Sequence, residues 1–179
     1  MRKLIALLLA AVMMLGAVSA LAEGNKMVVE YDQGMDISLI VPENMEAVEV
    51  MQNGVLCLIL AGKDEADNLP IVVMLVAADD QHDEAVRFND LTEEEKKAFA
   101  AELFEDDAEA PYEILTSGHG TEAVVVEYDV EGIDSLEVSS LYYGYAIHMY
   151  YGYADGHQLT DADKDFAMQL FTDLNFEVK

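Results

Sequence analysis

The chain has 179 residues, with 9 basic and 36 acidic side chains, and its formal net charge is −27. This charge argues against a nucleic-acid-binding protein, because such proteins hold phosphates mainly through Lys and Arg. Anionic membrane surfaces repel the chain for the same reason. The acids are spread along the whole sequence and 53% of the residues are hydrophobic, which argues against disorder.

The first 22 residues have the pattern of a secretory signal peptide. Arg2 and Lys3 precede residues 4–18, which are apolar apart from one glycine, and Ala20-Leu21-Ala22 fits the small-x-small rule for signal peptidase. An uncleaved membrane anchor is the alternative, although the apolar run is barely long enough to span a bilayer. We expect cleavage after Ala22 and a mature domain over 23–179, bacterial in appearance, that is secreted or held in the cell envelope without a membrane anchor.

The mature chain then has 157 residues, with 7 bases and 36 acids, because the signal segment contains two bases and no acid. This length suits a single domain. Cys57 is the only cysteine in the chain, so no internal disulfide forms. It lies within the apolar run 55–60, which is typical of a buried strand, and we expect a packed thiol that is not reactive.

The mature chain alternates strand-like segments with turns, and two of its threonines begin predicted helices. Thr92-x-x-Glu95 is a capping box, and Thr160 is followed by Asp161 and Asp163 in the first turn of the last helix. Asn53-Gly54 is a strong hairpin signal. The expected strands cover residues 26–32, 35–41, 46–51, 55–61, 71–77, 112–117, 121–129, 136–143 and 145–153, with a terminal strand or tail at 176–178.

This order of elements predicts an α+β fold. Strand mostly follows strand, so we expect a largely antiparallel sheet of about seven or eight strands with two main helices packed on it. Residues 71–77 are apolar on both faces and are therefore expected at the centre of the sheet. No internal repeat or linker divides the chain.

Three phrases in this layout resemble the PsbP-like superfamily of small exported α/β/α-sandwich domains. They are an opening strand that ends in proline (37–42, ISLIVP), a glycine-initiated strand (120–123, GTEA), and a closing segment from Leu159-Thr160-Asp161 to Leu174-Asn175-Phe176. The resemblance covers about 26–178 and implies that fold. It also implies an accessory or binding protein, since the better-known members are not enzymes. No binding residue of the family carries over, because no matching motif is present.

Six of the nine tyrosines lie between residues 142 and 153. They suit either structural packing with hydroxyls at the rim of the core or an aromatic platform for a protein, peptide or glycan. Strand alternation predicts that Tyr150 and His148 face the opposite side from the other tyrosines of the second strand. The candidate ligand-binding residues are Tyr142, Tyr143, Tyr145, Tyr151 and Tyr153.

The segment 79–84 is the candidate metal site. Ca²⁺ would bind its oxygens, and Zn²⁺ would add the imidazole. A solvated acidic loop without any cofactor is the favoured interpretation, because adjacent acids seldom converge on one ion without a fixed backbone. The candidate ligands are Asp79, Asp80, His82, Asp83 and Glu84.

No catalytic motif is recognisable in the sequence. There is no G-x-S-x-G, no P-loop and no H-E-x-x-H spacing. We therefore expect an exported, non-enzymatic accessory or binding domain. The alternatives are a divalent-cation-binding protein and an extracytoplasmic hydrolase. The hydrolase requires a cleft in which His119, His148 or His157 lies within hydrogen-bond reach of a carboxylate or hydroxyl.

Overall fold

The computed structural model describes residues 26–31, 35–63, 69–79, 86–103, 111–130, 133–153 and 158–178. The expected signal peptide lies outside these ranges and stays a prediction. Within them, every helix is too short or too polar to cross a membrane.

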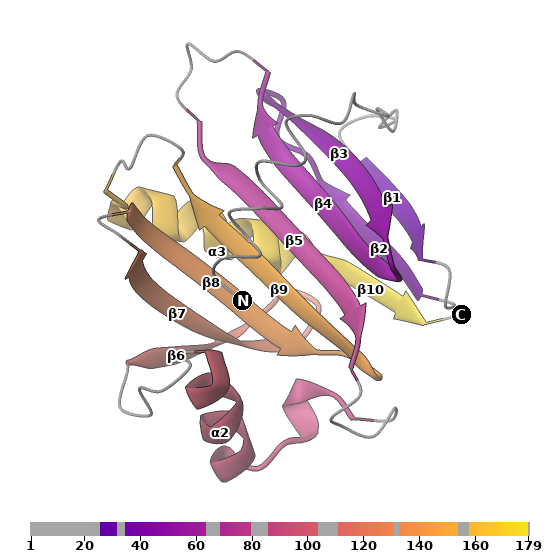
Figure 1. Cartoon of the computed structure of the whole chain (residues 1–179), viewed down its shortest axis with the longest axis vertical. Coiled ribbons are helices and arrows are strands. Elements are labelled where there is room, and N and C mark those ends of the chain that lie inside the picture. Colours follow the sequence, from indigo (N-terminus) through magenta and orange to yellow (C-terminus); the bar gives the residue numbers. More distant parts are fainter. Residues whose placement is uncertain are drawn as a thin grey trace.

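The described strands form two antiparallel sheets rather than one (Figure 1). The larger sheet has the order β3-β4-β5-β9-β8-β7-β6, and the smaller has the order β1-β2-β10. The strands of the larger sheet are β3 (Met45–Gln52), β4 (Val55–Gly62), β5 (Ile71–Ala78), β6 (Tyr112–Thr116), β7 (Glu122–Val130), β8 (Ile133–Leu141) and β9 (Tyr145–Gly152). Those of the smaller sheet are β1 (Lys26–Tyr31), β2 (Met35–Ile40) and β10 (Asn175–Val178).

Two helices and a short 3₁₀ turn complete the fold. They are η2 (Phe88–Asp90), α2 (Glu93–Leu103) and α3 (Asp161–Asp173). The predicted capping box is present: Thr92 and Glu95 exchange hydrogen bonds before α2. Thr160 caps α3 as predicted, and it forms a second capping box with Asp163. Each exchange satisfies backbone N–H groups that have no partner inside the helix.

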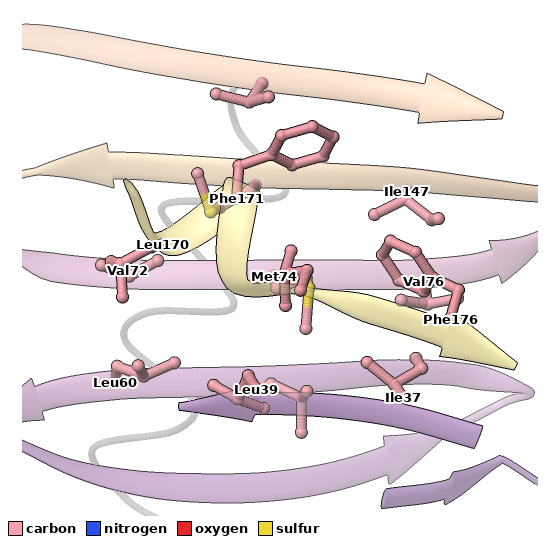
Figure 2. Packing of buried hydrophobic residues seen from close by; sticks show 14 of the residues in the cluster. Ile37, Leu39, Leu60, Val72, Met74, Val76, Ile147, Leu170, Phe171 and Phe176 are labelled. Carbon is pink, nitrogen blue, oxygen red and sulfur yellow. The ribbon is translucent and has the colours of Figure 1, made fainter. Parts of the chain in front are cut away.

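The main core lies between one face of the seven-stranded sheet and a layer made of the three-stranded sheet and α3. Figure 1 shows this layer behind the large sheet, and Figure 2 shows Leu170, Phe171 and Phe176 packed among Ile37 of β2 and Met74 of β5. The α+β expectation is confirmed. β1 alternates exposed and buried residues, so the second sheet has one buried side, which faces the main core. β10 pairs with β2 and widens this second sheet.

The opposite face of the seven-stranded sheet contains two separate apolar patches. One is formed by residues of β7 and β8 and of the η2 and α2 segments that cover them: Phe88, Phe99, Ala100, Val124, Val126 and Leu141. The other lies on β4 and β5: Cys57, Ile59 and Val73. Burial raises the pKa of the Cys57 thiol to about 11, so the sulfur stays protonated at neutral pH, in agreement with a thiol that is not reactive. As predicted, β5 is internal, between β4 and β9.

Candidate functional site

The tyrosine-rich segment forms the β8–β9 hairpin and places its rings on two sides of the sheet. The predicted alternation is confirmed: Tyr145 and Tyr151 join Ile147 and Met149 on the side of the main core, whereas Tyr150 packs against the Cys57 patch on the other side.

Three of the candidate tyrosines are held inside the structure. Tyr151 is 2% exposed, and Tyr145 packs edge-on against Tyr31. The hydroxyls of Tyr151 and Tyr153 donate to Asp163 Oδ1 at 3.2 and 2.5 Å. Burial is the main cause that raises the pKa of Tyr151, with the Tyr153 and Asp163 charges adding to it. These contacts give Tyr145, Tyr151 and Tyr153 packing roles, while ligand binding by the set stays a prediction.

The turn of the same hairpin presents the remaining two candidates at one end of the sheet. Tyr142 and Tyr145 exchange backbone hydrogen bonds of 2.9 and 3.2 Å around a two-residue turn. Tyr143 and Gly144 occupy it with φ angles of +49° and +81°, which is the left-handed geometry of a type I′ hairpin turn. Tyr142 donates its hydroxyl to the Phe176 carbonyl at 2.9 Å, whereas Tyr143 is 37% exposed.

Arg87 supports this turn from a distant part of the sequence. Its guanidinium lies 5.5 Å from the Tyr143 ring centroid and donates two 2.9 Å hydrogen bonds to the carboxylate of Asp90. The Asp90 hydrogen bond is the main cause that raises the pKa of Arg87, so the cation persists at every relevant pH. We call Arg87, Tyr142 and Tyr143 the tyrosine tip.

A second polar feature lies between the two apolar patches on the face away from the main core. We call Glu137, Ser139 and His148 the polar cluster. Ser139 Oγ donates to Glu137 Oε1 at 2.8 Å, and His148 Nδ1 lies 2.8 Å from Ser139 Oγ and 3.1 Å from Glu137 Oε1. The strand register brings the three together, because Ser139 pairs directly with His148.

The polar cluster contains the residue types of a hydrolytic triad but not its geometry. In a triad, the two ring nitrogens of histidine serve different partners: one faces the nucleophile and the other faces the acid. Here both Ser139 and Glu137 lie against the same nitrogen, Nδ1. Ser139 is also fully buried, so a substrate carbonyl cannot reach its hydroxyl in this conformation. The arrangement satisfies buried polar atoms on a largely apolar face.

The other candidate residues are only partly described. Asp79 donates its backbone N–H to the Gly144 carbonyl at 2.8 Å, beside the tyrosine tip. Asp80, His82, Asp83, Glu84 and His157 lie outside the described residues, and His119 is exposed in the turn between β6 and β7. Over the part of the chain that the structure describes, no three His, Cys, Asp or Glu side chains are grouped as a metal site. Ca²⁺ or Zn²⁺ binding by the 79–84 segment stays a prediction.

Sequence reasoning named His148 as a candidate, and the hydrogen-bond reach to a carboxylate or hydroxyl that a hydrolase requires is met at this residue. It missed Arg87 and the two partners of His148 in the polar cluster, Glu137 and Ser139. For the cluster a signal was available: a hairpin that turns at Tyr143-Gly144 must pair Ser139 with His148, and alternation places Glu137 on the same face. For Arg87 no local pattern exists, since its contact with the turn comes from an isolated bridge between Arg87 and Tyr142.

Comparison with known proteins gives evidence about the fold. No family model and no curated protein matches the chain. Among solved structures, it is similar to the solution structure of cyanobacterial PsbP (CyanoP) from Synechocystis sp. PCC 6803, with a TM-score of 0.51 and 15% sequence identity. The match covers 93% of this chain and 99% of the cyanobacterial one. The two chains therefore share their fold over nearly their whole length, and the present chain has a PsbP-like α+β fold.

Proposed function

We propose that this protein is an exported, non-enzymatic accessory domain that binds a partner outside the cytoplasm through the tyrosine tip. The signal-like sequence of residues 1–22 supports export. The PsbP-like fold supports an accessory role by analogy, because the better-known members of the PsbP-like superfamily are not enzymes.

The exposure of Tyr143 is the observation that carries the proposal. Tyr151 is buried and Tyr142 is hydrogen-bonded to the backbone of Phe176, while Tyr143 is 37% exposed at the end of the sheet. Tyrosine combines a large apolar ring with low side-chain entropy, which is why it is enriched at the energetic centres of protein interfaces. An aromatic ring placed on a rigid hairpin end suits a protein or peptide partner.

The geometry of the polar cluster supports the non-enzymatic part. It is the only His–carboxylate–hydroxyl group that the hydrogen bonds of the described residues join, and its shared nitrogen and buried serine favour a structural role over acyl transfer.

Export is tested by the N-terminus of the protein that is recovered outside the cytoplasm. We expect Glu23 as the first residue, and we expect Ala22→Arg to block processing and leave the protein in the membrane fraction. An Ala6→Leu variant, which keeps the apolar run, serves as the matched control. Recovery of a cytoplasmic protein that still starts at Met1 would overturn the proposal.

Binding is tested by placing a photo-crosslinking aromatic residue at position 143 in the producing organism. The same residue at position 114 is the matched control, because Ile114 is similarly exposed, at 41%, on the edge strand β6. We expect one discrete adduct from position 143 and none of that mass from position 114. Identical adducts from both positions, or none from position 143, contradict binding at the tyrosine tip.

A further inference from the structure

Two hairpin turns of the large sheet have the same backbone geometry, but the first turn residue is favourable for that geometry in one and unfavourable in the other. Asn53 and Gly54 connect β3 and β4 with φ angles of +52° and +80°, and Tyr143 and Gly144 connect β8 and β9 with +49° and +81°. Asn is a favoured residue at the first of these positions, since its short side chain tolerates left-handed backbone. A bulky aromatic residue is an outlier there.

The surroundings of Tyr143 hold it in this unfavourable conformation from several directions. Its backbone N–H donates to the Val86 carbonyl at 3.0 Å, and its ring packs edge-on against Tyr142 at 4.8 Å between centroids. The Arg87 guanidinium lies over it and is itself fixed by Asp90. Left-handed non-glycine residues persist where neighbours over-determine them, and they concentrate at ligand-binding positions. The fold thus accepts a poor turn residue and retains a rigid, exposed ring.

The charges around the ring point to the sign of its partner. Arg87 is already paired with Asp90, and the backbone N–H of Asp79 donates to the Gly144 carbonyl, which places this acidic residue beside the turn. Glu177 is exposed and close enough to contribute to the raised pKa of Tyr142, for which burial is the main cause. Acidic residues at and beside the tip, namely Asp79, Asp90 and Glu177, therefore outnumber the one nearby cation of Arg87, on a chain whose net charge is −27. An acidic surface attracts basic partners, and an aromatic face attracts Lys and Arg through its quadrupole.

We infer that Tyr143 is a preformed aromatic anchor that recognises a Lys- or Arg-bearing segment of a protein partner. The inference rests on the proposed function and adds the chemistry of the partner. The cation of the partner lies against the part of the Tyr143 ring that Arg87 does not cover, and the neighbouring acidic residues contribute the long-range attraction. Arg87 acts as a positioning residue, because it contacts the ring and fixes its orientation.

The test measures peptide binding and thermal stability on the same variants. The probes are a ten-residue Gly-Lys repeat, a Gly-Arg repeat and the Gly-Lys repeat with acetylated lysines, and the protein is the full chain as purified from its producing cell. We expect Tyr143→Asn to weaken binding of both basic peptides about 10-fold, which corresponds to about 1.4 kcal/mol. We expect Tyr143→Phe to retain the binding, and the acetylated peptide to bind far more weakly than the basic ones.

Stability separates an anchor from a structural residue. Because Asn suits the turn, Tyr143→Asn should leave Tm within about 3 °C of the parent or raise it. Ile114→Asn is the matched surface control and should bind the basic peptides as the parent does. Equal peptide binding by the parent and Tyr143→Asn, or a fall in Tm of more than about 3 °C in Tyr143→Asn, overturns the inference. A crosslinked partner at position 143 without peptide binding overturns only the basic chemistry, whereas loss of both also overturns the proposed function.

Discussion

The two faces of the seven-stranded sheet bury different kinds of side chains, although the same strands form both faces. On the inner face, a row across the strands runs through Met74, Met149 and Val138, all of them buried and apolar. On the outer face, the neighbouring row runs from Val73 through Tyr150 to Glu137, so a carboxylate that is 5% exposed sits among apolar neighbours.

This difference follows from what covers each face. The inner face meets a continuous layer of the three-stranded sheet and α3, and apolar burial against such a layer contributes roughly 25 cal/mol per Å². On the outer face, α2 packs on β7 and covers the patch that contains Phe99. The Cys57 patch on β4 and β5 is separate from it. Between these patches the polar side chains of the cluster can be buried because they hydrogen-bond to one another. We therefore expect substitutions on the inner face to cost more than those on the outer face.

The largest expected effect is the loss of Phe171, which is fully buried between α3 and the sheet. Phe171→Ala should lower the free energy of unfolding by about 3–5 kcal/mol, because it removes a large ring and leaves a cavity. The comparison variant is Phe99→Ala in α2. Phe99 is 8% exposed on the outer face, and the cost of its loss should be smaller. Urea unfolding measures both values, and a larger loss for Phe99→Ala would reverse the ranking of the two faces.

A smaller effect is expected at Glu137 in the polar cluster. Glu137→Ala should cost about 2 kcal/mol, since it leaves the Ser139 hydroxyl and His148 Nδ1 without their shared carboxylate in a buried site. Glu137→Gln keeps an acceptor oxygen and should cost less than half as much by the same unfolding measurement. If the two variants are equally destabilised, the charge rather than the hydrogen bonds stabilises the cluster.

Local patterns predicted most of the elements, while long-range partners lay beyond them. Asn53-Gly54 identified a turn because both residue types tolerate left-handed backbone. Thr160 identified a helix start because its hydroxyl accepts a hydrogen bond from a backbone N–H of the first turn. The separate sheet could not be predicted, since the pairing of β10 with β2 joins residues such as Phe176 and Ile37 that no local pattern relates. The candidate tyrosines were recognised by composition alone, and the support of Tyr143 by Arg87 depends on tertiary packing.

The smallest predicted effect is a pH dependence at the rim of the inner face, where Asp163 receives the hydroxyls of Tyr151 and Tyr153. Burial tends to raise the pKa of Asp163, but hydrogen bonds from Thr160, Tyr153 and Tyr151 outweigh it and lower the pKa to about 2. The folded pKa is below the unfolded value of about 3.9. Ionised Asp163 therefore contributes stability that is present above about pH 4 and is lost as the pH falls towards 2.

Asp163→Asn isolates this contribution, because it keeps the shape of the side chain and removes the charge. The parent should be more stable than the variant by roughly 1 kcal/mol at pH 6, after allowance for solvent screening, and the gap should close between pH 4 and pH 2. Tyr153→Phe is the matched control, because it removes one donor to Asp163. When Asp163→Asn is compared with its parent in the Tyr153→Phe background, the stability gap should close at a higher pH. A gap that stays constant from pH 6 to pH 2 would mean that the rim is held by packing, as the rest of the inner face is, and not by the Asp163 charge.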